Sequence, residues 1–200
     1  MTVQPGAAPR LLVVPGLHDS GPAHWQSWLE SLHPDAVRVV QADWSVPDVD
    51  RWAAQVGATL AHAGADRPWL AVAHSFGCLA VARHLRLEGE RSPIAAVLLV
   101  APAEPDKFGV GALLPQRPLG LPATLVASRN DPWMRLDWSR RWAERWGCHH
   151  VDLGDAGHIN AEAGFGRLPL AGRWVRAMEQ RAARRRRPAH AAFAEWSFAV

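Results

Sequence analysis

The stretch Trp69–Ala80 reads WLAVAHSFGCLA and changes character at one serine. An apolar run leads up to Ser75 and an amphipathic run follows it, which indicates a buried strand, a tight turn and a helix. A nucleophilic serine is presented in this setting, where the residues two positions before and after it must be small. Ala73 and Gly77 meet that requirement. The start of the helix would add positive potential at the Ser75 hydroxyl.

Six short aliphatic runs recur along the chain. They lack polar alternation, which is typical of strands buried on both faces of a parallel sheet. Stretches with helical spacing separate them, so strand and helix alternate. The sequence therefore predicts one α/β domain, a three-layer α/β/α sandwich with a six-stranded parallel sheet and no large lid domain. The runs are Arg10–Val14, Val37–Gln41, Trp69–Ala73, Ala95–Val100, Ala123–Ala127 and His149–Leu153.

Eleven tryptophans raise the alternative of a surface that stacks sugars or bases. Trp138, Trp142 and Trp146 stand four residues apart, however, and this spacing favours a helix face packed on the sheet. Segment 102–122 carries five prolines and is predicted to be an irregular excursion after a strand end. It is a candidate substrate-facing loop.

A serine hydroxyl is a weak nucleophile without a base, and taken alone Ser75 is equally well explained as a helix N-cap. In the α/β-hydrolase fold an acid and a histidine follow the serine in that order, each after a later strand. Asp131 follows the run Ala123–Ala127 in a turn stiffened by proline, and His158 follows the run His149–Leu153 on a Gly-rich loop. Each has an ordinary explanation as a loop residue. Their order and their places at successive strand ends favour a triad, with His158 as general base and acid and Asp131 orienting it.

Two further acids compete with Asp131 for this role. Asp152 and Asp155 lie within a few residues of His158 on the same connection. A carboxylate from the neighbouring strand reaches the imidazole more naturally, which favours Asp131.

The oxyanion formed in such a reaction needs two hydrogen-bond donors. The backbone N–H of Phe76, directly after the nucleophile, is expected to be one of them. The loop Val13–Gly21 should supply the other, and we expect the Leu17 N–H because Gly16 lets the loop turn close to Ser75. The loop contains neither G-x-x-x-x-G-K-[ST] nor G-x-G-x-x-G, which disfavours nucleotide binding.

Ten histidines raise the question of a metal site. They show no ligand spacing supported by carboxylates, and H-E-x-x-H does not occur. We therefore expect no metal and no cofactor. His74, beside the nucleophile, is expected to be a buried packing residue rather than a second base.

The net charge of +3 is concentrated at the end of the chain. Residues 181–200 hold five arginines and one glutamate, or +4, which leaves −1 for the rest. No basic face with interleaved aromatic residues occurs in the body, so nucleic acid is not expected as a partner. The domain is predicted to span residues 1–182 and to be followed by a basic, mobile tail at 183–200. Binding of that tail to nucleic acid or to an anionic membrane stays an alternative.

The chain has no signal-peptide pattern, no apolar run long enough to cross a membrane and only two cysteines. These features lead us to expect a cytoplasmic protein with no membrane partner. The sequence does not specify an oligomeric state.

Taken together, the motifs resemble those of the YdeN-like, retinoblastoma-binding protein 9-like small serine hydrolases, over roughly residues 10–180. The resemblance implies a minimal α/β-hydrolase fold without a lid and hydrolysis of small ester or amide acyl groups. It also implies a triad of Ser75, Asp131 and His158. Leu168 stands where the family commonly has tryptophan. The matching pieces are Val14–Leu17, Ser20–Gln26, Asp43–Trp44, Ala73–Gly77, Asn130–Pro132 and Gly157–Asn160.

Within this resemblance, the pair His24–Trp25 and the turn Asp43–Trp44 are candidates for the edge of an acyl pocket. A core Trp25 and a helix-starting His24 explain the first pair at least as well. We predict a serine hydrolase that acts through an acyl-enzyme on a small-molecule acyl substrate, a carboxylic ester or an amide. The alternative is a protein-interaction module on a hydrolase scaffold, as the partner-binding name within the family suggests.

Overall fold

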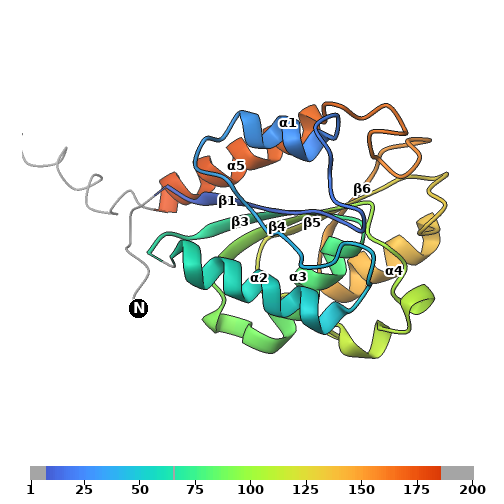
Figure 1. Ribbon diagram of the computed structural model, residues 1–200, viewed down its shortest axis with the longest axis horizontal. Coiled ribbons are helices and arrows are strands. Elements are labelled where there is room, and N and C mark those ends of the chain that lie inside the picture. Colours follow the sequence, from blue (N-terminus) through green and yellow to red (C-terminus); the bar gives the residue numbers. More distant parts are fainter. Residues whose placement is uncertain (1–7, 65, 186–200) are drawn as a thin grey trace, which may run out of the picture.

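A six-stranded parallel sheet forms the middle layer of the protein in a computed structural model that describes residues 8–64 and 66–185 (Figure 1). The strand order is β2-β1-β3-β4-β5-β6, and all neighbouring strands are parallel. The predicted fold class is confirmed. The strands are β1 (Arg10–Val14), β2 (Val37–Arg38), β3 (Trp69–His74), β4 (Ile94–Val100), β5 (Ala123–Ala127) and β6 (His149–Asp152).

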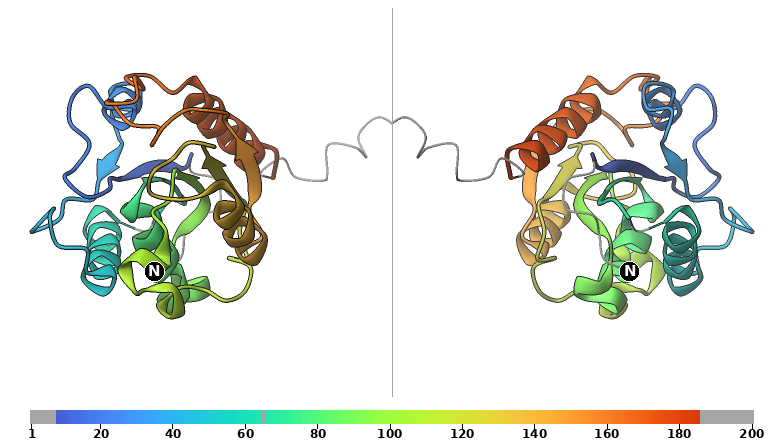
Figure 2. Two further views of the ribbon diagram at one scale, coloured as in Figure 1. Left: turned by 90° about the vertical axis from the view of Figure 1, so that its right-hand side faces the viewer. Right: turned by 90° about the vertical axis from the view of Figure 1, so that its left-hand side faces the viewer.

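Helices cover both faces of this sheet. Figure 2 shows α1 and α5 on one side of it and α2, α3 and α4 on the other. The connection from β4 to β5 is irregular, as predicted for segment 102–122, and contains two short 3-10 helices, η2 and η3. The helices are α1 (Trp25–Ser31), α2 (Val49–Ala63), α3 (Phe76–Glu88), η1 (Gly89–Arg91), η2 (Pro105–Phe108), η3 (Gly111–Leu113), α4 (Leu136–Trp146) and α5 (Pro169–Arg185).

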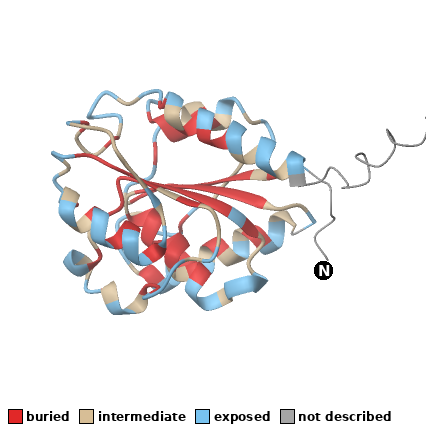
Figure 3. Cartoon of the chain, turned by 180° about the vertical axis from the view of Figure 1, so that it is seen from behind, coloured by how far each residue is buried: buried red, intermediate tan, exposed pale blue. Residues whose placement is uncertain are grey.

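The core consists of two apolar clusters, one on each face of the sheet. In β1, Leu12 and Val14 belong to the cluster under α2, α3 and α4, whereas Leu11 and Val13 belong to the one under α1 and α5. Successive side chains of a strand point to opposite faces, so a strand covered on both sides must be apolar at every position. Figure 3 shows the strands buried in the middle layer.

The predicted helix face of tryptophans is confirmed. Trp142 and Trp146 on α4 are buried in the cluster under α2, α3 and α4, and Trp138 packs against this cluster partly buried. These three side chains therefore serve the core rather than a stacking surface.

Strand β2 is shorter than the predicted run Val37–Gln41. It ends at Arg38, although the Val39 N–H still donates to the carbonyl of Val13. β2 is an edge strand with one neighbour, and Val40 is already 57% exposed. The chain can leave the sheet there because no second strand holds it.

Helix α5 continues to Arg185 and so crosses the domain boundary predicted at residue 182. The remainder of the predicted tail, residues 186–200, lies outside the described residues. In the part that is described, no helix combines the length and apolar character needed to traverse a bilayer.

Candidate active site

Ser75 occupies a strained turn between β3 and α3. Its φ is +51° and its ψ is −124°, a backbone region that residues with a side chain rarely adopt. The Ser75 N–H donates to the carbonyl of Val100 on β4, and its own carbonyl accepts from the Cys78 N–H. Ser75 stands at the N-cap position of α3, but its side chain makes no capping hydrogen bond, so capping does not explain the serine. The hydroxyl is instead free to point away from the helix.

The turn packs directly on the end of β1. A Cβ atom added at Gly77 would lie 2.3 Å from the Pro15 carbonyl oxygen, and one at Gly16 would lie 2.7 Å from Ser75 Cβ. Both positions therefore require glycine. Neither the Leu17 nor the Phe76 N–H meets a hydrogen-bond acceptor among residues 8–64 and 66–185. Both groups stay available to a bound oxygen atom.

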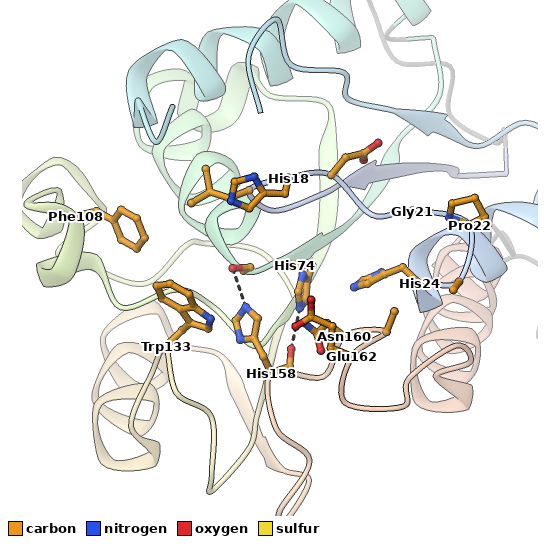
Figure 4. A pocket seen from close by; sticks show the side chains of 15 residues that line it. His18, Gly21, Pro22, His24, His74, Phe108, Trp133, His158, Asn160 and Glu162 are labelled. Atoms are coloured by element: carbon orange, nitrogen blue, oxygen red, sulfur yellow. Dashed lines mark hydrogen bonds between the residues drawn. The ribbon is translucent and has the colours of Figure 1, made fainter. Parts of the chain in front are cut away.

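The structure brings the three predicted triad residues into one hydrogen-bonded chain (Figure 4). His158 Nε2 lies 2.9 Å from Ser75 Oγ, and His158 Nδ1 lies 2.9 and 3.0 Å from the two carboxylate oxygens of Asp131. A carboxylate only accepts hydrogen bonds, so Nδ1 carries the proton and Nε2 accepts from the serine hydroxyl. Asp131 also accepts from the Trp133 N–H at 2.8 Å. The side chains of His158 and Asp131 are only 10% and 2% exposed, which strengthens their interaction.

The two rival acids are placed elsewhere. Asp152 pairs with Arg129 and Arg140 and accepts from the Gly154 N–H. Asp155 is exposed. Asp131 is the acid that the geometry supports.

A cavity of about 520 Å³ opens beside Ser75. Phe108 reaches it from η2, so the irregular segment 102–122 faces this cavity. Trp133 and Glu162 also line it, and sequence reasoning missed both; Trp133 directly follows the Asp131-Pro132 turn, whereas no pattern marks Glu162. Its lining includes the apolar side chains of Leu17, Phe108 and Trp133 and the polar side chains of His18, Asp19 and Glu162.

The proposed pocket-edge pairs behave differently. His24 lines the cavity and also starts α1, where its Nδ1 accepts from the Gln26 N–H. Trp25 is fully buried in the core. The Asp43–Trp44 turn does not line the cavity. It stabilises the loop of Leu17 instead, because the Trp44 carbonyl accepts a hydrogen bond from the His18 N–H.

Two further imidazoles lie beside His158. The ring centroid of His74 is 4.9 Å from that of His158, and the ring of His24 is 4.8 Å from that of His74. Burial, with repulsion from His158 and His24, holds the pKa of His74 well below its usual value. Burial, followed by repulsion from Arg38 and His158, lowers the pKa of His24 to about 4. Both rings are therefore neutral at physiological pH.

His74 is buried as predicted, but it is more than a packing residue. Its Nε2 lies 3.0 Å from the backbone carbonyl of His158. Among the described residues, no group of three or more His, Cys, Asp or Glu side chains is arranged to hold a metal ion.

A serine on a strand–helix turn, joined through a histidine to an acid at the carboxyl ends of a parallel sheet, places this protein among the α/β-hydrolases. The family comparison is more specific. A family model described as serine hydrolase matches residues 11–189, and the chain belongs to this family. The protein is accordingly a hydrolytic enzyme.

Solved structures support the same assignment. A putative YdeN-like hydrolase from Pectobacterium atrosepticum is 36% identical, with a TM-score of 0.78 over 88% of this chain and 91% of that one. The ydeN gene product of B. subtilis is 18% identical, with a TM-score of 0.69 over 84% and 97%. The esterase RhEst1 from a Rhodococcus species is 15% identical, with a TM-score of 0.62 over 88% and 90%. The last two show the fold alone. The resemblance to YdeN-like hydrolases is confirmed, while no curated protein matches the chain.

Proposed function

We propose that the protein hydrolyses small carboxylic esters, or amides, through an acyl-enzyme formed on Ser75. The observation that carries this proposal is the position of His158, whose ring lies 2.9 Å from Ser75 Oγ on one side and 2.9 Å from Asp131 on the other. A base within this distance of a hydroxyl, and itself oriented by an acid, can activate the hydroxyl for attack.

In the proposed reaction His158 Nε2 takes the Ser75 proton while Oγ attacks the carbonyl carbon of the substrate. The oxygen that becomes negative accepts hydrogen bonds from the N–H groups of Phe76 and Leu17. The imidazolium, stabilised by Asp131, then gives its proton to the leaving alcohol or amine, and the acyl group stays on Ser75. Water attacks the acyl-enzyme by the same proton transfers, which releases the carboxylic acid and restores the serine.

The size and the lining of the cavity favour a small substrate with an apolar group. About 520 Å³ is within the range of ordinary small-molecule sites. Trp133 is 48% exposed, which is unusual for so large an apolar side chain, and it faces the cavity together with Phe108. These two aromatic rings offer an apolar surface to an acyl or alkoxy group.

Intact-mass analysis after treatment with a fluorophosphonate tests the proposal. We expect one adduct on the wild type and none on Ser75→Ala, because only an activated serine reacts. Ser45→Ala is a matched control, since Ser45 is an exposed serine outside the site, and it should be labelled like the wild type. Ester turnover by Ser75→Ala should fall by ~10⁴-fold or more.

The circular dichroism spectrum of Ser75→Ala should match that of the wild type, because the substitution removes only a hydroxyl group and opens no new cavity in the core. Retained turnover in that variant would show that Ser75 is not the nucleophile. A folded wild type that takes no adduct would favour the protein-interaction alternative.

A further inference from the structure

The loop that carries His158 contains a strained residue directly after the histidine. Ile159 has φ +47°, a left-handed conformation that is costly for a β-branched side chain. Its side chain is fully buried, so the surrounding structure must hold this conformation in place.

Two buried side chains donate hydrogen bonds to the backbone carbonyl groups of His158 and Ile159, which lie before and after the strained φ of Ile159. The Nε2–H of His74 donates to the carbonyl of His158 at 3.0 Å, and the Nε1–H of Trp25 donates to the carbonyl of Ile159 at 2.8 Å. The donor of His74 must be Nε2–H, because a carbonyl oxygen only accepts. His74 is 5% and Trp25 0% exposed, so both donors are buried.

The preceding residues of the loop are held from the other side. The Ala156 N–H donates to Ser128 Oγ at 2.9 Å, and the Gly157 N–H donates to Asn130 Oδ1 at 2.7 Å. Ser128 and Asn130 belong to the segment after β5 that carries Asp131.

The loop that carries His158 is therefore hydrogen-bonded on one side to the segment that carries Asp131 and on the other to β3, which leads to Ser75. His74 is the residue directly before Ser75, and Trp25 begins α1. Figure 4 shows the His74 ring beside the His158 backbone, within the same site. A shift of the loop would change the distance between His158 Nε2 and Ser75 Oγ.

We propose that His74 and Trp25 are positioning residues, which hold the strained loop 156–159 so that His158 meets both Ser75 and Asp131. This inference rests on the proposed function. Neither side chain supplies a proton to the reaction, because the donor of each is bound to a backbone carbonyl. The low pKa of His74 is consistent with this role, since a neutral ring adds no second charge beside an imidazolium.

Trp25→Phe and His74→Leu remove the two donors and keep most of the apolar volume. Misplacement of a reacting group by about 1 Å can cost ~10²-fold in rate, so we expect kcat to fall ~10- to 100-fold with little change in KM. The rate of fluorophosphonate labelling should fall in the same proportion. His74→Gln keeps an N–H donor in place of the imidazole and should recover most of the rate.

Trp146→Phe is the matched control. Trp146 is also buried, in the cluster under α2, α3 and α4, and its Nε1–H donates to the carbonyl of Pro115 at 3.0 Å. It should lose thermal stability like Trp25→Phe but keep kcat and the labelling rate within about twofold of the wild type.

Amide hydrogen exchange provides a readout besides activity. Residues 156–160 should exchange faster in His74→Leu and Trp25→Phe, and not in Trp146→Phe. If both variants keep kcat and the labelling rate at the level of Trp146→Phe, the positioning role is wrong while the proposed function stands. If the wild type itself is not labelled at Ser75, the proposed function fails and the inference fails with it.

Discussion

Among single residues, Asp131 links the His158 ring to the turn that carries Trp133. It accepts from the His158 ring and from the Trp133 N–H, and it is almost completely buried. The negative charge holds His158 in the tautomer with its proton on Nδ1, which leaves Nε2 free to accept from Ser75.

We expect Asp131→Asn to lower kcat for ester hydrolysis by ~10³- to 10⁴-fold. The amide NH₂ can donate to His158 Nδ1 and so favours the tautomer in which Nε2 is already protonated. Asp155→Asn is the control, because Asp155 is exposed on the loop before His158, and its kcat should stay near the wild-type value. A similar loss in both variants would argue against a specific role of Asp131.

Gly77 is the residue where the turn after Ser75 leaves no room for a side chain. A Cβ atom there would lie 2.3 Å from the Pro15 carbonyl oxygen and 2.5 Å from that of Val14, and backbone atoms cannot move aside as a flexible side chain can. Gly77→Ala should lower the free energy of unfolding by about 1–3 kcal/mol or more, measured by urea denaturation. Gly21→Ala meets nothing within 4 Å and should remain close to the wild type. Equal stability of the two variants would contradict this packing argument.

Among the elements, α4 carries three tryptophans spaced four residues apart whose burial increases towards the end of the helix. Trp146 is 1% and Trp142 3% exposed, whereas Trp138 is only partly buried at the start of the helix. Trp146 also binds the carbonyl of Pro115 and so ties the irregular connection between β4 and β5 to the helix.

Trp146→Ala should therefore destabilise the protein by about 3–5 kcal/mol, as expected for loss of a buried aromatic ring. Trp138→Ala should cost clearly less, because part of its ring is already in water. Urea denaturation of both variants measures the difference. An equal loss would show that burial along α4 does not determine the energetic contribution.

At the scale of the whole molecule, the site lies where helices on one face meet the carboxyl ends of the strands, and this arrangement buries the imidazole of His24. The pKa of His24 is about 4 in the folded protein, against 6.5 for the free group. Between these values the unfolded chain binds more protons than the folded one. This difference in proton binding by His24 lowers the free energy of unfolding as the pH drops from 6.5 towards 4.

His24 contributes up to roughly 3 kcal/mol to this loss, at about 1.4 kcal/mol for each pH unit of the shift. His24→Asn keeps a side chain able to cap α1 and removes the titrating ring. We expect its free energy of unfolding to fall less than that of the wild type between pH 7.5 and pH 4.5. Parallel pH profiles of the two proteins would show that His24 does not carry the effect.

Local sequence patterns are enough to predict the sheet and the order of the residues around the site. Apolar runs such as Trp69–Ala73 are local patterns. A parallel sheet brings the carboxyl ends of its strands to one edge regardless of the conformation of the loops. For this reason Ser75, Asp131 and His158 could be predicted as a group before any distance was known.

The contacts that hold these residues in place depend on how distant elements pack in the folded protein. The left-handed Ile159, its bond from Trp25 and the bond from His74 to the His158 carbonyl join residues 134 and 84 positions apart, and no local pattern marks them. The early end of β2 likewise depends on a missing neighbour rather than on its own composition. Periodicity encodes which face of an element is buried, whereas the partner of a buried polar group depends on which distant elements pack beside it.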